Sequence, residues 1–432
     1  MSNRHFSFRE LSLSSIKKNK LLSGSLMVFV GSLIVGFGNY LFQIIMGRML
    51  GPEDFGLLAA LLSITLILAV PTQTINHVVS KTVADLTGKN QKNKIFSFLK
   101  QIIKKASFYG VFLSIVFLLF SSQVKKLLNL DSIAPLIVLS GYFLFSFLVP
   151  VGLGFMRGLQ QFVRLSFSQI VMVFSKLLIG VFLVKIGLGI LGAMIAIPLA
   201  SVIFIIMVYA WFSRRDVLKN EETNIDWKSL FSYMKPVFIV SLCLVFIYNI
   251  DVLFAKHFLD QKNAGLYAGL VLFGKIIFFA TSSVPVVLFP IAAKNKIMRI
   301  SNLKVFKIAL LVVSFVSGVI TLVYFLFPDR IINLILGAEY ISIQPLLWKI
   351  AVVFTVYSII NLISLFALSI RKTNFTYVLV GSVVLEVLLL LNFHDNISQI
   401  LNVYLISVVF SLLLLILHFF ITNKNICQMK IR

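Results

Sequence analysis

Long apolar stretches, separated by short polar connectors, run through the whole chain. A helix needs about 20 mostly apolar residues to cross a bilayer, whereas a membrane-spanning strand is half as long and alternates. The stretches do not alternate, so they predict about twelve transmembrane helices in an all-α polytopic membrane protein. The predicted spans cover residues 22–47, 55–80, 106–124, 133–156, 167–185, 190–212, 237–257, 264–291, 306–328, 346–370, 375–393 and 397–421.

Composition agrees with lipid as the solvent for most of the chain. Of the 432 residues, 59% are hydrophobic and 12% are charged, and the mean hydropathy is +1.01. A soluble domain is about 45–50% apolar and about 25% charged. A water-soluble fold of this length could not hide so much apolar surface.

The basic residues gather in every second connector. The chain has 39 Lys and Arg against 15 Asp and Glu. If the N-terminus is cytoplasmic, the cytoplasmic segments carry 29 basic residues and the outer loops carry 7. Because cytoplasmic loops are rich in Lys and Arg, this asymmetry predicts an inner (plasma) membrane protein with both termini in the cytoplasm. It also explains the net charge of +24 without nucleic acid, which we do not expect as a partner.

A weak internal repeat divides the chain. The pattern formed by Leu50, Gly56 and Leu57 recurs 209 residues later. Six helices per half make parallel repeats, related by an axis along the membrane normal, and such transporters often place the substrate between their two lobes. We therefore expect two six-helix lobes around a central cavity, with an N-terminal lobe (1–212), a cytoplasmic linker (213–236), a C-terminal lobe (237–421) and a cytoplasmic tail (422–432).

Four ionisable residues fall inside predicted spans, where a charge is costly and is by default a functional candidate. Lys176 and Lys275 lie near the middle of their spans and suit an anionic substrate. Asp251 and Glu386 lie in the outer parts of theirs and suit coupling to sodium or protons. The alternative is that a lysine pairs with an acid or snorkels, and that Glu386 braces helix packing.

Polar side chains add short stripes to these spans. Gln169 lies two turns before Lys176 on the same face, Asn39 and Gln43 are one turn apart in the first span, and Asn361 lies in the tenth. Single polar residues of this kind often hold helices together. Stripes from both halves together predict a polar central cavity.

Sequence motifs for enzymes are lacking. Residues 187–192 spell GxGxxG, but they follow a membrane helix and have Trp211 and Phe212 where a nucleotide site needs an acid, so we interpret them as a tight turn. There is no Walker, HExxH or GxSxG sequence, and only Cys243 and Cys427 are cysteines, so no disulfide framework or CxxC metal site is possible. We expect no enzyme, no metal and no cofactor beyond a coupling Na+ or H+.

The residues Gly-Arg-Met-Leu-Gly-Pro-Glu-Asp-Phe-Gly at positions 47–56 resemble a segment of the polysaccharide-export flippases. These belong to the multidrug/oligosaccharidyl-lipid/polysaccharide exporter superfamily. Further similar segments follow in order and cover nearly the whole chain, at 158–162, 249–251, 264–268, 289–290 and 336–340. The lipid II flippase branch is expected to carry two additional C-terminal helices beyond the twelve predicted here, so we do not expect this chain to belong to that branch.

This resemblance implies alternating access and flipping of a polyprenyl-diphosphate-linked oligosaccharide from the cytoplasmic to the outer leaflet. A diphosphate suits cations in a low-dielectric cavity, which makes Arg48 a further candidate beside Lys176 and Lys275. Arg48 also sits beside a turn, which it could cap, or it could pair with Glu53. Implied partners are the lipid-linked oligosaccharide, membrane lipids and other proteins of polysaccharide assembly.

Other classes stay open at this point. A cation-coupled antiporter for small organic cations is the main alternative, against which the two mid-membrane lysines argue. A membrane glycosyltransferase or polymerase needs a catalytic acid or a large outer loop, and the longest outer loop here is 329–345. A scaffold would leave the buried charges unexplained.

Overall fold

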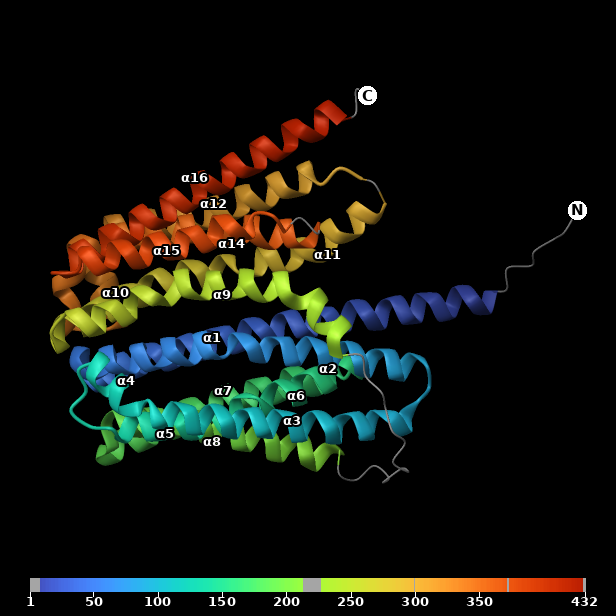
Figure 1. Ribbon diagram of the computed structural model, residues 1–432, viewed down its shortest axis with the longest axis horizontal. Helices are drawn as coiled ribbons and strands as arrows, with labels where there is room; N and C mark the ends of the chain where they lie inside the picture. Colours follow the sequence, from blue (N-terminus) through green and yellow to red (C-terminus); the bar gives the residue numbers. More distant parts are fainter. Residues whose placement is uncertain (1–7, 213–226, 299, 371–372, 430–432) are drawn as a thin grey trace, which may run out of the picture.

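The computed structural model describes residues 8–212, 227–298, 300–370 and 373–429, and within these ranges the chain is helical without a strand (Figure 1). The helices are α1 (Phe8–Leu68), α2 (Val70–Gly88), α3 (Lys92–Leu119), α4 (Ser121–Leu127), α5 (Ala134–Ser146), α6 (Leu148–Gly158), α7 (Phe162–Leu183), a π-helical turn (Val184–Leu188), α8 (Gly189–Phe212), α9 (Trp227–Phe258), α10 (Gln261–Thr281), α11 (Ser283–Ile297), α12 (Leu303–Leu326), α13 (Pro328–Ile335), the 3-10 helix η2 (Ala338–Leu346), α14 (Leu347–Ser369), α15 (Thr376–Asn392) and α16 (Ile397–Met429).

The twelve predicted crossings are present. In the described part of the chain, nine helical stretches are long and apolar enough to cross a membrane. Two of them, Met27–Leu68 and Phe162–Trp211, each contain a reversal of the chain and so count as two crossings. The apolar helix α15 is shorter and supplies the twelfth. The protein is therefore a multi-pass α-helical membrane protein.

Glycine permits both reversals. Gly51 has φ 72° and ψ 176°, a conformation essentially restricted to glycine, and it separates the first crossing from the second within α1. Gly187 (φ 95°) and Gly189 (φ 51°) make the turn between α7 and α8. The GxGxxG sequence is thus a turn between membrane helices, as predicted.

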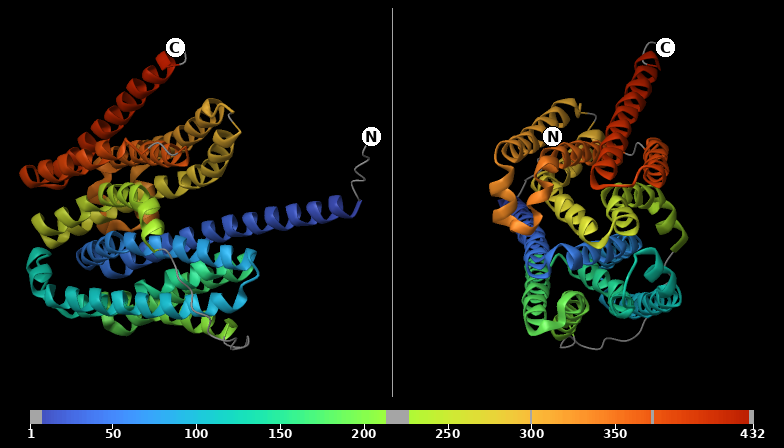
Figure 2. Two further views of the ribbon diagram at one scale, coloured as in Figure 1. Left: turned by 45° about the vertical axis from the view of Figure 1, so that its right-hand side comes forward. Right: turned by 90° about the vertical axis from the view of Figure 1, so that its left-hand side faces the viewer.

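The helices form two bundles that lie side by side, α1–α8 and α9–α16 (Figures 1 and 2). We call them the N-lobe and the C-lobe. The predicted linker falls partly on residues 213–226, which lie outside the described residues, while its remainder, 227–236, belongs to α9. The predicted tail continues α16 as far as Met429.

Connectors that the charge pattern assigned to one side lie at one end of the molecule. The α2–α3 and α11–α12 connections, the start of α1 and the end of α16 lie at the right of Figure 1, and we call this the basic end. The chain reversal within α1, α4 and the α9–α10 turn lie at the left of Figure 1, and we call this the Gly51 end because Gly51 makes that reversal.

The two lobes meet closely at the Gly51 end. A Cβ atom added to Gly265 of α10 would lie 1.6 Å from the Pro52 carbonyl oxygen, and one added to Gly56 would lie 2.7 Å from the Gly265 nitrogen. The hydroxyl of Tyr340, a fully buried residue, donates to the Gly47 carbonyl at 3.1 Å. Backbone therefore touches backbone across the lobes at this end.

Candidate functional site

Lys176 and Asn39 form a polar pair between α7 and α1 in the N-lobe. Lys176 lies half-buried on α7, and its Nζ donates a 2.5 Å hydrogen bond to Asn39 Oδ1 on α1. The same ammonium lies 4.5 Å from the centroid of the Phe42 ring. An amide oxygen and an aromatic face stabilise a cation without neutralising it, so neither of these contacts supplies Lys176 with a counter-charge.

Gln43 and Gln169 lie on the same two helices, α1 and α7, as Asn39 and Lys176. The two helices run parallel, since Gly31 faces Ser166 and Gly38 faces Val173. Gln169 therefore lies on the basic-end side of Lys176, and Gln43 lies on the Gly51-end side of Asn39. Both glutamines are half-buried. The four predicted N-lobe residues thus lie on the same two helices, with Lys176 and Asn39 in contact, and we call them the N-lobe seam.

Asp251 is the centre of the polar part of the C-lobe. It is fully buried on α9, and its Oδ2 accepts a 2.7 Å hydrogen bond from the Tyr267 hydroxyl on α10. Its Oδ1 has no hydrogen-bond partner among the described residues. A proton or a cation is the kind of partner that satisfies a buried carboxylate oxygen of this sort.

Glu386 of α15 is a second buried carboxyl in the same region. Both of its carboxyl oxygens lack a hydrogen-bond partner within the described ranges. It lies close enough to interact electrostatically with Asp251 and with the hydroxyl of Tyr404, which is likewise buried without a partner in the described chain. Two buried carboxyl groups and a buried phenol thus lie within electrostatic reach of one another.

Lys275 of α10 also interacts with this cluster. It is buried, interacts electrostatically with Asp251, and its Nζ lies 4.9 Å from the centroid of the Tyr248 ring. Tyr248 packs in turn on Phe278 and Tyr357, with ring centroids 5.1 and 5.4 Å apart. The cation therefore lies against an aromatic cluster and within electrostatic reach of an acid.

Asn361 and three tyrosines complete the C-lobe set. Asn361 is buried on α14, one turn after Tyr357, whose hydroxyl donates to the Leu244 carbonyl at 3.0 Å. Tyr248, Tyr267 and Tyr404 were not predicted as site residues. The 16-residue interval between Asp251 and Tyr267 spans the turn between α9 and α10, so no helical periodicity signals that they meet.

Arg48 lies apart from both clusters, at the Gly51 end. Its Nη2 donates to the carbonyl oxygens of Asn333, at 2.9 Å, and Leu334, at 2.6 Å. These carbonyls belong to the last turn of α13 in the C-lobe. Arg48 therefore caps a helix of the opposite lobe, and its assignment to the diphosphate stays a prediction.

A family model described as "Polysaccharide biosynthesis protein" matches residues 21–296, which is more than half of the chain. The chain belongs to this family. The matched segment contains the N-lobe seam, Arg48, Asp251 and Lys275. Comparison with curated protein sequences gave no match.

Solved structures similar to this polysaccharide biosynthesis protein are MATE transporters. An inward-facing conformation of a multidrug resistance MATE family transporter of the MOP superfamily aligns with a TM-score of 0.73 and 14% identity, covering 91% of this chain and 95% of the other. An outward-facing conformation described in the same words gives 0.60 at 15% identity, covering 90% and 93%. A MATE structure in the straight conformation gives 0.66 at 14% identity, covering 96% and 97%. At these identities the likeness establishes the fold.

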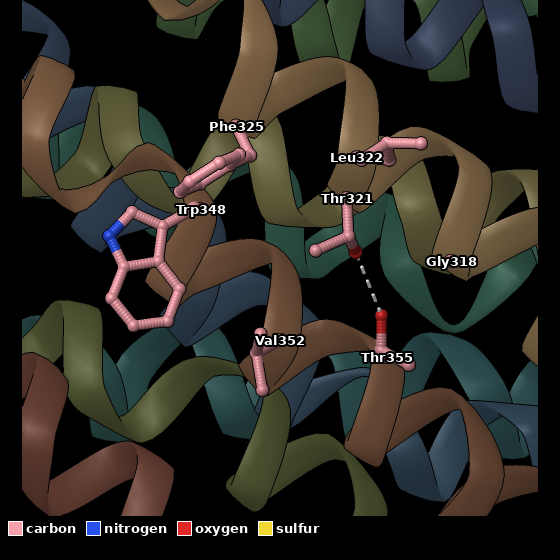
Figure 3. A pocket seen from close by; sticks show the side chains of 7 residues that line it. All are labelled: Gly318, Thr321, Leu322, Phe325, Trp348, Val352 and Thr355. Carbon is pink, nitrogen blue, oxygen red and sulfur yellow. Dashed lines mark hydrogen bonds between the residues drawn. The ribbon is translucent and has the colours of Figure 1, made fainter.

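A groove on the C-lobe of the polysaccharide biosynthesis protein lies outside these clusters (Figure 3). It has a volume of about 360 Å³, and a 3.3 Å hydrogen bond joins two of its hydroxyls, those of Thr321 and Thr355. Its walls are otherwise apolar, and Phe325 and Trp348 are exposed at its rim. The lining residues are Gly318, Thr321, Leu322, Phe325, Trp348, Val352 and Thr355. None of the predicted site residues lines it.

Proposed function

We propose that this protein flips a polyprenyl-diphosphate-linked oligosaccharide from the cytoplasmic to the outer leaflet of the inner membrane, for cell-surface polysaccharide synthesis. Membership of the polysaccharide biosynthesis family supports the glycan cargo, and the transporter fold supports movement of a substrate. Neither requires a catalytic step.

The observation that carries the proposal is the pair of lysines inside the membrane. Lys176 is held by an amide oxygen and a ring, and Lys275 by a ring and a more distant acid. A diphosphate places two negative phosphates close together, and cations in a low-dielectric setting bind such a group strongly. A small organic cation would be repelled by both lysines.

The arrangement of the lobes supports an orientation. The lobes are hydrogen bonded at the Gly51 end, through Arg48 and Tyr340. The higher TM-score to an inward-facing transporter than to an outward-facing one agrees with closure at the outer side. With the basic end in the cytoplasm, the diphosphate and glycan enter between the lobes while the polyprenyl tail stays in lipid.

Coupling is assigned to Asp251 and Glu386. Three buried carboxylate oxygens without hydrogen-bond partners in the described chain are a site that a proton or a sodium ion would satisfy. Occupancy of that site biases the lobes only if the ion binds one arrangement more tightly than the other. Since Asp251 is bonded to α10, a helix that contacts the N-lobe, a change at this site reaches the lobe interface directly.

The second candidate function is a cation-coupled antiporter for small organic compounds. The MATE fold favours it, because the similar structures include multidrug resistance transporters. It uses the same carboxyl groups and leaves Lys176 without a role.

Genetic complementation tests the proposal. Strains that lack their own polysaccharide flippase, each with a different repeat unit, would receive the wild type or Lys176→Ala, and surface polysaccharide would be measured. We expect the wild type to restore the polymer in a matching strain and Lys176→Ala to fail. Restoration of resistance to organic cations, with no polysaccharide in any strain, would favour the antiporter.

A further inference from the structure

The carbonyl groups at the end of α13 explain what Arg48 binds. The last carbonyls of a helix lack partners within the helix. In α13 the Ile332 carbonyl accepts from the backbone nitrogens of Leu336 and Gly337, at 2.9 and 3.0 Å. The carbonyl groups of Asn333 and Leu334 remain, and the Arg48 guanidinium donates a hydrogen bond to each of them. A cation at a helix C-terminus is also favoured by the helix dipole.

The residue before Arg48 makes a second bond to the same part of the C-lobe. The Gly47 carbonyl accepts from the Tyr340 hydroxyl, and Tyr340 lies in η2, directly after α13. The Tyr340 ring packs edge-on against Phe55, with centroids 6.5 Å apart. One turn of α1 thus binds the α13–η2 segment through the Arg48 side chain and through the Gly47 backbone carbonyl.

These bonds cross the lobe interface where it is tightest. Gly56 of α1 and Gly265 of α10, whose backbones touch, lie near these bonds, because the Tyr340 ring packs against Gly269, one turn along α10 from Gly265. Any movement that opens the Gly51 end must separate them. Arg48 is exposed, so water can replace its carbonyl partners when the lobes part, and the bonds can form and break repeatedly.

We propose that Arg48 is a positioning residue that latches the Gly51 end shut by capping α13, and that releasing this cap is part of each opening of the outer gate. The inference deepens the proposed alternating-access function, but it concerns the conformational equilibrium and can be tested without substrate. Arg48 acts through the lobe interface and need not touch the cargo.

The test measures the distance between the lobes at the Gly51 end. Spin labels are placed at Lys185→Cys in the N-lobe and Ser342→Cys in the C-lobe, both exposed positions, in a chain with Cys243→Ala and Cys427→Ser. Distance distributions are recorded by double electron–electron resonance in nanodiscs without substrate. The variants are Arg48→Gln, Arg48→Lys and Tyr340→Phe. The matched control is Arg330→Gln, an exposed arginine of α13 whose guanidinium lies over its own lobe's Phe327.

We expect a mainly short distance in the wild type and in Arg330→Gln. Arg48→Gln should raise the ratio of long to short distances about fivefold or more. Arg48→Lys should fall between, because its ammonium keeps the charge at the helix C-terminus but ends the side chain one atom earlier than Arg48 Nη2, and Tyr340→Phe should shift the ratio in the same direction. If Arg48→Gln does not fold, the last two variants decide the outcome.

Unchanged distances in Arg48→Gln, or equal shifts in Arg48→Gln and Arg330→Gln, would overturn the latch. Unchanged distances with lost flipping would instead make Arg48 a substrate ligand. The distances are recorded without substrate, so a result that overturns the latch does not bear on the proposed cargo. A flipping assay that finds no transport of the proposed cargo likewise does not bear on the latch.

Discussion

Lys176 Nζ and Asn39 Oδ1 are 2.5 Å apart and join α7 to α1 within the N-lobe. Both residues were candidates from their positions alone, on different predicted spans 137 residues apart. The bond orients the ammonium without supplying a counter-charge. A lysine held in this way inside a membrane protein can still accept an anion, and the first prediction tests that.

Lys176→Gln should lower the rate of flipping about tenfold or more, because it removes a charged hydrogen-bond donor worth about 1.5–3 kcal/mol. Lys176→Arg should retain more activity, since it keeps the charge. The matched control is Lys349→Gln, which breaks a similar lysine–asparagine bond, 2.6 Å to Asn402 on α16. Flipping at the wild-type rate in Lys176→Gln would remove this residue from the working site.

Asp251→Asn should abolish the dependence of transport on the sodium or proton gradient. The substitution keeps the size of the side chain and removes the charge that a cation would neutralise. Tyr267→Phe should weaken the dependence less, because it removes only the 2.7 Å hydrogen bond that orients the carboxylate. The measurement is initial transport rate against imposed gradient in proteoliposomes, with the exposed Asp329→Asn as control. An unaltered gradient dependence in Asp251→Asn would refute the assignment.

Gly265→Ala should force the lobes apart at the Gly51 end. Its new methyl group would meet the Pro52 carbonyl oxygen at 1.6 Å, and the backbone on both sides leaves little room to yield. Overpacking costs about 1–3 kcal/mol, which corresponds to a shift of about 5- to 150-fold toward the separated arrangement. Accessibility of a cysteine at the Gly51 end to a membrane-impermeant thiol reagent measures the shift.

The control for that substitution is Gly318→Ala, where a Cβ has nothing within 4 Å. It should leave the accessibility as in the wild type. Equal labelling of Gly265→Ala and wild type would mean that the close approach of the two backbones does not hold the end shut.

Much of the fold could be predicted from the sequence. The hydropathy pattern predicts the crossings because lipid imposes the same length and polarity on each of them. The charge asymmetry predicts which connectors share an end. Helices α4 and α13 and η2 were missed, because they are short segments at a membrane end, where no rule of length or hydropathy applies.

The candidate site could be predicted only in part. Buried charges such as Asp251 and Glu386 stand out in apolar spans, but their common neighbourhood depends on the packing of α9 against α15, which has no local signature. Arg48 illustrates the limit. Its partners are backbone carbonyls 285 and 286 residues away, and a carbonyl carries no residue type that a sequence could reveal.

Flipping by the purified protein is the most direct test of the account. Wild type and Lys176→Gln would be reconstituted into liposomes that contain labelled polyprenyl-diphosphate oligosaccharides with several repeat units, and protection of the glycan from an external glycosidase would be followed over time. The account predicts that the wild type accelerates exchange of at least one of these lipids between the leaflets and that Lys176→Gln does so about tenfold more slowly. A wild type that moves none of them, yet drives uptake of small organic cations against a gradient, would contradict it.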